Sequence, residues 1–183
     1  MAVTPFNVLK ENQRAERKML LTVAEWSEGE GQSAETIREL LGRRTEDSSI
    51  EYNPDIQTST DILGINYTDV NKTQPEQAFD PFLILGGSKL GAKLDDIRRR
   101  NAVSELDQFT VYIITAYIDK STTEGTNAYA AEKQENCTIT YESLGGDSNV
   151  NFPITVHYSN NTTRGTVNKL TDDFVFTADA NQG

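Results

Sequence analysis

The chain has 183 residues, of which 36% are hydrophobic and 25% are charged, and its formal net charge is −11. This length and composition are typical of one folded domain rather than of a disordered chain. The excess of acids argues against a protein that grips nucleic acid, because such binding needs clustered Lys and Arg. Nucleic acid could still slide past such a surface.

The first segments are a polar arm, a strand and a segment of ambiguous structure. Residues 1–18 are polar and charged and are expected to form the arm, and MLLTVAEW at 19–26 predicts the strand. SAETIRELLGRR at 33–44 has the propensities of a capped helix that stops at Gly42. Tertiary contacts can also turn so short a segment into a strand, so both interpretations stay open.

Residues 50–62, IEYNPDIQTSTDI, alternate strictly and predict one long strand. One face is apolar or β-branched, and the other is polar, with acids and no base. The apolar face carries Ile50, Tyr52, Ile56, Thr58, Thr60 and Ile62, and the polar face carries Glu51, Asn53, Asp55, Gln57, Ser59 and Asp61. Because Pro54 cannot donate to a ladder, we expect it at a bulge or at a sheet edge.

The central part of the chain holds a polar segment and the best helix. Residues 66–82 are polar and contain Pro75 and Pro81, which predicts a strand edge followed by a long loop where a partner could bind. SKLGAKLDDIRRRN at 88–101 predicts a helix capped by Ser88, with one apolar stripe and a basic end. The stripe is Leu90, Leu94 and Ile97, and the basic end is Arg98, Arg99 and Arg100.

The remaining segments predict strands at 108–118, 135–144, 150–159 and 166–177, with a polar loop at 120–131. Many strands, late hairpins and one central helix indicate a mainly β (α+β) fold. We expect a β-sandwich or barrel of two packed sheets flanked by one α-helix. This single domain is expected to span 19–177, with a short C-terminal tail at 178–183.

No group of residues indicates a catalytic, metal or cofactor site. Gly86 and Gly91 in GGSKLGAK lack the spacing of a phosphate-binding loop. His157 is the only histidine, which removes most zinc sites, and on its strand it is expected to face the surface. Cys137 is the only cysteine and is expected to be a buried, inert thiol. We therefore expect no enzyme and no cofactor.

Two interpretations of the basic run are equally open. Arg98, Arg99 and Arg100 can complement the helix dipole as solvated charges, or they can form ion pairs with an acidic neighbouring copy. The apolar runs FLIL and VYIITAYI are far shorter than a membrane span, so we expect no membrane segment.

Four segments together resemble the major tail protein, or tail tube protein, of long-tailed bacteriophages. The segments are EDSSIEYNPDIQTSTDILGINYTDVNKTQPEQAFDPF, GGSKLGAKLDDIRRRNAVSEL, QFTVYIITAYI and SLGGDSNVNFPITVHYSN. The resemblance runs in the same order over residues 19–177 and departs at the N-terminal arm and at 27–44. It implies a structural virion protein whose copies form hexameric rings, and rings that stack into a tube.

The resemblance also implies the partners and the location. DNA would pass through the tube during ejection without specific binding. A tape-measure protein would lie inside the tube, and tail terminator and baseplate proteins would bind its ends. The protein would be assembled in the host cytoplasm and would reside in the virion tail.

In such a ring, the polar face of residues 50–62 becomes an acidic lumen that repels DNA. We expect the apolar face, through Ile50, Tyr52, Ile56 and Ile62, to pack inward on the helix stripe. The residues expected to face the lumen are Glu51, Asp55, Gln57, Ser59 and Asp61. The residues expected at contacts between copies are Asn71, Lys72, Arg98, Arg99 and Arg100.

The alternative is a monomeric β-sandwich that binds carbohydrate or cell wall. Such a module favours an exposed aromatic platform. Trp26 is the only tryptophan and lies at the end of an apolar run, which gives the platform little support.

Overall fold

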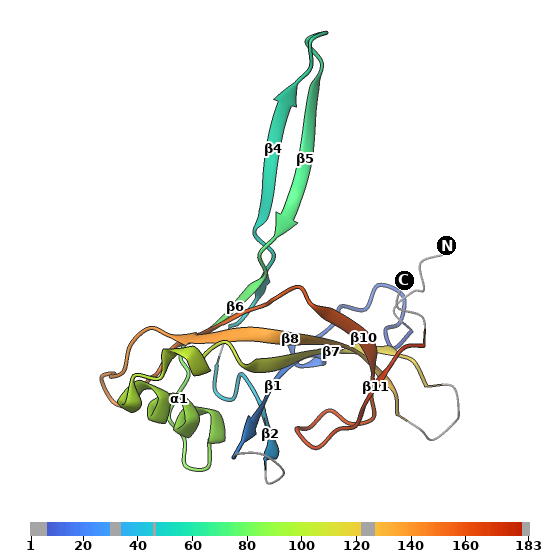
Figure 1. The fold of residues 1–183 in the computed structure, drawn as a ribbon. Helices are drawn as coiled ribbons and strands as arrows, with labels where there is room; N and C mark the ends of the chain where they lie inside the picture. Colours follow the sequence, from blue (N-terminus) through green and yellow to red (C-terminus); the bar gives the residue numbers. More distant parts are fainter. Residues whose placement is uncertain (1–6, 30–33, 46, 122–126, 181–183) are drawn as a thin grey trace.

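The computed structural model describes residues 7–29, 34–45, 47–121 and 127–180, and within them it has many strands and one α-helix (Figure 1). The mainly β (α+β) fold with two packed sheets and one helix is confirmed. The elements are β1 (Leu20–Glu28), β2 (Glu35–Leu40), β3 (Ile50–Glu51), β4 (Pro54–Thr60), β5 (Asn66–Thr73), β6 (Glu76–Phe79), α1 (Lys89–Arg100), β7 (Phe109–Asp119), β8 (Tyr129–Tyr141), β9 (Ile154–His157), β10 (Thr162–Val167) and β11 (Phe176–Ala178).

The strands of the body form one antiparallel array in the order β2-β1-β7-β8-β9-β6-β3. Strand β8 belongs to both halves of this array. Its first part pairs with β10, which also carries β11, and its last residues pair with β9. The main core contains side chains from both halves, so the two halves face each other across it.

Helix α1 fills one end of the main core, as the apolar stripe predicts. Leu90, Leu94 and Ile97 are fully buried. Ser88 caps the helix by accepting a hydrogen bond from the backbone N–H of Gly91 at 3.1 Å. The helix ends at Asn101, which adopts a left-handed conformation with φ 55°.

A second, smaller core lies on the other face of β1 and β7, under the C-terminal segment. Phe174 packs edge-on against Tyr112, with ring centroids 4.9 Å apart. The Arg38 guanidinium lies over the Phe174 ring at 4.6 Å and donates to the Phe174 carbonyl. These contacts hold the segment between β10 and β11 against the sheet.

Of the two interpretations left open for residues 33–44, the structure shows the strand. Residues 35–40 form β2, because pairing along β1 satisfies their backbone groups and overrides their helical propensity. Several other element predictions need correction. Residues 66–82 contain the two strands β5 and β6 rather than a long loop. The expected strand at 166–177 is split, because β10 ends at Val167 and β11 starts at Phe176. Of the predicted loop at 120–131, residues 122–126 lie outside the described residues, and residues 129–131 belong to β8.

The predicted long strand at 50–62 is also wrong. It breaks at Asn53, which has φ 41°, between β3 in the body and β4 outside it. Ile50 lies at the edge of the main core, but Tyr52, Ile56 and Ile62 are exposed and do not pack on the helix. Because the chain leaves the sheet at Asn53, the apolar face beyond that residue has no core to meet.

Candidate assembly site

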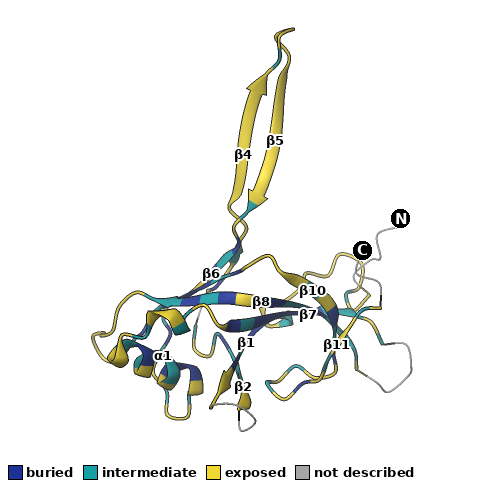
Figure 2. Cartoon of the chain, in the orientation of Figure 1, coloured by how far each residue is buried: buried dark blue, intermediate teal, exposed yellow. Residues whose placement is uncertain are grey.

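Strands β4 and β5 form a separate two-stranded sheet that projects away from the body (Figure 1). Figure 2 shows this hairpin as exposed along nearly its whole length. The hairpin carries large apolar side chains in water. Ile56 is 57% exposed, Val70 60% and Ile62 101%.

The register of the hairpin gives it two chemically different faces, because directly opposed residues share a face. The apolar face, which is mostly β-branched, consists of Ile56, Thr58, Thr60, Asn66, Thr68 and Val70. The polar face consists of Asp55, Gln57, Ser59, Tyr67, Asp69 and Asn71. Asn71 Nδ2 donates to Asp55 Oδ2 across the polar face at 3.4 Å.

The tip of the hairpin is organised by Asp61. Its Oδ1 atom accepts from the backbone N–H groups of Leu63 at 2.8 Å and Ile65 at 2.9 Å, and Oδ2 accepts from the Tyr67 hydroxyl at 3.2 Å. The hydrogen bond from the Ile65 amide, followed by those from Leu63 and Tyr67, lowers the pKa of Asp61. Asp61 therefore shapes the turn and presents Ile62, Leu63 and Ile65 to solvent.

The foot of the hairpin is tied to the body by a few hydrogen bonds. The Gln74 N–H donates to the Tyr52 carbonyl at 3.1 Å, and Asn53 Nδ2 donates to Glu76 Oε1 at 3.0 Å. Pro54 lies at a register shift of the two-stranded ladder, as expected for a proline at a bulge.

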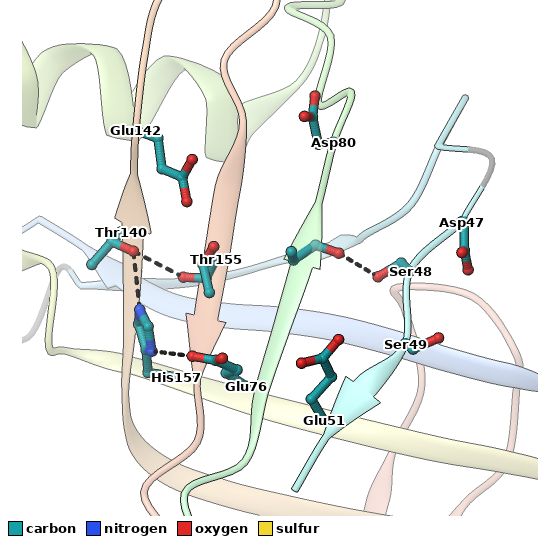
Figure 3. A pocket seen from close by; sticks show the side chains of 11 residues that line it. Asp47, Ser48, Ser49, Glu51, Glu76, Asp80, Thr140, Glu142, Thr155 and His157 are labelled. Carbon is teal, nitrogen blue, oxygen red and sulfur yellow. Dashed lines mark hydrogen bonds and ion pairs between the residues drawn. The ribbon is translucent and has the colours of Figure 1, made fainter. Parts of the chain in front are cut away.

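Below the hairpin, the outer face of β3, β6, β9 and β8 forms a groove of about 460 Å³, which we call the acidic groove (Figure 3). Strand alternation places its lining side chains opposite the buried ones: Glu76 and His157 face the groove, while Gln77 and Val156 face the core. The carboxylates that line the acidic groove belong to Asp47, Glu51, Glu76, Asp80 and Glu142.

His157 is held within this surface. Its Nδ1 lies 3.5 Å from Glu76 Oε2, and its Nε2 lies 3.1 Å from the Thr140 hydroxyl. The carboxylates come from separate segments and point into the groove at different places (Figure 3). Among the described residues, no three His, Cys, Asp or Glu side chains are grouped so that they could hold a metal ion. The described lining residues make the groove a negatively charged surface.

The three arginines at the end of α1 all form ion pairs with acids of this chain. The pairs are Arg98–Asp95, Arg99–Asp95, Arg100–Asp96 and Arg100–Glu105, at 2.7, 2.7, 2.7 and 2.8 Å. Arg99 still has a largely exposed side chain, so a contact with a second copy there stays a prediction.

The residues expected to face a lumen are not on one surface. Glu51 lies in the acidic groove, Asp55, Gln57 and Ser59 lie on the polar face of the hairpin, and Asp61 supports the tip. Asn71 and Lys72 lie on β5 and are exposed. All of these side chains are outside the core, and their position relative to a lumen stays a prediction.

Sequence reasoning missed the other acids of the acidic groove. Glu76 and Asp80, on and directly after β6, and Glu142, directly after β8, come from two segments that only the strand pairing brings beside Glu51. ITVH at 154–157 alternates between apolar and polar residues, but EQAF at 76–79 does not, and nothing in the sequence tells which strands are neighbours. Cys137 is buried as expected, and burial raises the pKa of its thiol.

No known family model matches the chain, and no curated protein matches it either. Within the described residues, no helix is long and apolar enough to cross a membrane. The function must therefore be argued from the hairpin and from the surfaces around it.

Proposed function

We propose that the chain is a structural subunit that assembles with copies of itself, and that the assembly is the tail tube of a long-tailed phage. The observation that carries this proposal is the projecting hairpin with its exposed apolar face and tip. The resemblance of the sequence to tail tube proteins supplies the specific assembly of stacked hexameric rings.

The physical reason is that a hairpin of this kind gains little from standing alone. A two-stranded hairpin is marginally stable in water, and exposed apolar groups together with open strand edges favour association. The tip carries the exposed apolar residues Ile62, Leu63 and Ile65. Their burial stabilises the protein only when another surface covers them. The self-association of identical chains provides such a surface at every position in an assembly.

The charge of the molecule supports a role as a conduit. The acidic groove and the polar face of the hairpin carry acids on a chain whose net charge is −11. If these surfaces line a lumen, they repel the phosphates of passing DNA and prevent it from binding. Tape-measure, terminator and baseplate proteins would be the partners, and the virion tail the location, with assembly in the host cytoplasm.

The alternative, a carbohydrate- or cell-wall-binding module, loses its best candidate residue. Trp26 is only 4% exposed and packs edge-on against Phe109, so it offers no platform for a sugar ring.

The test compares the wild-type chain with a variant in which residues 54–73 are replaced by two glycines. The Gln74 N–H already bonds to the Tyr52 carbonyl at 3.1 Å, so the two ends of the shortened connection lie close together. The replacement removes one hydrogen bond to the body, from Asn160 Nδ2 to the Thr73 carbonyl at 2.8 Å. We expect rings or hollow tubes from concentrated wild-type protein in negative-stain electron microscopy. We expect a folded monomer from the variant, with an unchanged circular dichroism spectrum of the body.

A wild-type chain that stays monomeric at every concentration in sedimentation would contradict the proposal. Binding of that monomer to a glycan array would then favour the carbohydrate-binding alternative.

A further inference from the structure

We propose that the hairpin tip of one copy inserts into an apolar groove at the foot of the hairpin in a second copy. This inference rests on the proposed self-assembly and names the two surfaces that meet. The tip surface is Ile62, Leu63 and Ile65. The receiving surface, which we call the apolar groove, lies where β3 approaches β7 and β8.

The apolar groove has a volume of about 460 Å³, within the range of roughly 300–1,000 Å³ that is typical of sites that bury a bound group. Its aliphatic lining comes from Leu20, Ile50, Ile113 and Ile118, and Tyr52 stands at its mouth with 60% of its surface exposed. The groove thus offers apolar surface of the kind that the tip lacks in its own chain.

The tip is already shaped for insertion. Asp61 fixes the turn through the amides of Leu63 and Ile65, and Leu63 and Ile62 are 77% and 101% exposed. A group that is rigid before binding loses less conformational entropy when it binds. The tip therefore has the features of an anchor that fills a pocket.

The charges of the two surfaces are complementary. The turn that carries the tip surface, residues 61–65, contains one acid, Asp61, and no Lys or Arg. The described residues that line the apolar groove include three bases, Arg17, Lys120 and Arg164, and one acid, Glu132. Lys120 forms an ion pair with Asp179 at 2.7 Å, so the excess of positive charge comes from the two arginines. Arg17 donates to the backbone carbonyls of Leu20 and Ser48, which holds its guanidinium at the rim. Such an arrangement favours an acidic segment over a basic one.

The geometry decides what kind of contact results. The hairpin points away from the body, so a tip cannot reach the groove at its own foot (Figure 1). Tip and groove are different surfaces, so each copy can give one contact and receive another. A contact of this type is heterologous and produces rings or open filaments instead of closed two-fold dimers. A continuous tube requires such contacts, in which every copy both gives a tip and receives one.

The experiment uses two full-length variants that each lose one surface. The tip variant carries Ile62→Asp and Leu63→Asp, and the groove variant carries Tyr52→Asp and Ile118→Asp. The control variant carries Val103→Asp and Val175→Asp, two exposed apolar residues that line neither surface. Sedimentation measures self-association, and thermal unfolding checks the fold.

We expect the tip and groove variants each to lose roughly a hundredfold in self-association, the size of a 2–3 kcal/mol contact, while the control associates like wild type. An equimolar mixture of the two variants should form a heterodimer that grows no further, since it has one intact tip, one intact groove and no others left. If Ile118→Asp prevents folding, Tyr52→Asp alone serves as the groove variant, because that side chain is exposed.

Other results separate the two proposals. If the tip variant or the groove variant assembles as well as the wild type, this inference is overturned and the proposed function still stands. The same holds if both variants are monomeric and their mixture stays monomeric. A wild-type chain without any self-association would overturn both.

Discussion

At the scale of single residues, two carboxylates have their pKa lowered by hydrogen bonds that also organise the surrounding structure. Asp61 serves the hairpin tip, and Glu105 connects α1 to the turn that follows it, through Lys93 at 2.6 Å and Arg100 at 2.8 Å. Both side chains stabilise only the structure near them, so their removal should leave the rest of the fold intact.

Replacing Asp61 with Ala should loosen the tip without unfolding the body. The backbone amides of Leu63 and Ile65 lose their acceptor, so their hydrogen exchange should become faster, which NMR can measure. The folded-state pKa of Asp61 is lowered, so its contribution is present above 3.8 and is lost as the pH falls toward the folded pKa. Asp69→Asn in the middle of the same hairpin is the control and should leave these two amides unchanged.

Glu105 should make the stability of the body depend on pH in the acid range. Hydrogen bonds from Arg100 and then from Lys93 lower the pKa of Glu105 from 4.5 to about 2. Its contribution is therefore complete above 4.5 and is lost as the pH falls to about 2. Glu105→Gln should cost about 0.5–1 kcal/mol at pH 7, since the pair is partly exposed, and should flatten the pH dependence of urea unfolding in this range.

The control for this titration is Asp107→Asn, an exposed acid two residues along the chain. An equal flattening in both variants would contradict a specific role for Glu105.

At the scale of elements, the pairing of β10 with β11 depends on a position that has no room for a side chain. A Cβ atom on Gly165 would lie 2.3 Å from the Thr177 carbonyl oxygen and 2.7 Å from the Phe176 ring. The strand that closes the second core can thus approach its neighbour only at a glycine.

Gly165→Ala should therefore destabilise the protein by about 1–3 kcal/mol, because the neighbouring strand must shift. Gly86→Ala is the matched control, since a Cβ atom at Gly86 meets nothing within 4 Å. Chemical denaturation of both variants measures the difference, and equal stabilities would show that β11 yields without cost.

At the scale of the whole molecule, we expect the acids to act through the charge of the surface that many copies would form together. Lysines in place of Glu51, Asp55 and Gln57 should leave the tip and the apolar groove unchanged, because these side chains lie on the acidic groove and on the polar face of the hairpin. We expect tubes of this variant to retain short duplex DNA that wild-type tubes release, and the retention should weaken as salt rises.

Cosedimentation of tubes with labelled DNA at two salt concentrations measures this effect. Asp107→Lys, at an exposed site outside both surfaces, is the control for charge alone. Equal retention by the control and the triple variant would place the three residues outside the lumen.

The sequence by itself determined the elements whose signals are local. The cap at Ser88 and the stripe of Leu90, Leu94 and Ile97 predict α1 within one residue at each end, because a helix satisfies its backbone within its own segment. The buried run at 108–118 likewise predicts β7. The mainly β fold class follows from the many predicted strands and the single predicted helix.

Only the tertiary structure decided where strands find their partners. Residues 35–40 became a strand because β1 offered a free edge, against their helical propensity. Alternation continues through Asn53, so the sequence of 50–62 cannot tell a strand that stays in a sheet from one that leaves it. The acids of the acidic groove and the exposed hairpin exist only because distant segments pair or fail to pair, and this pairing is a property of the whole chain.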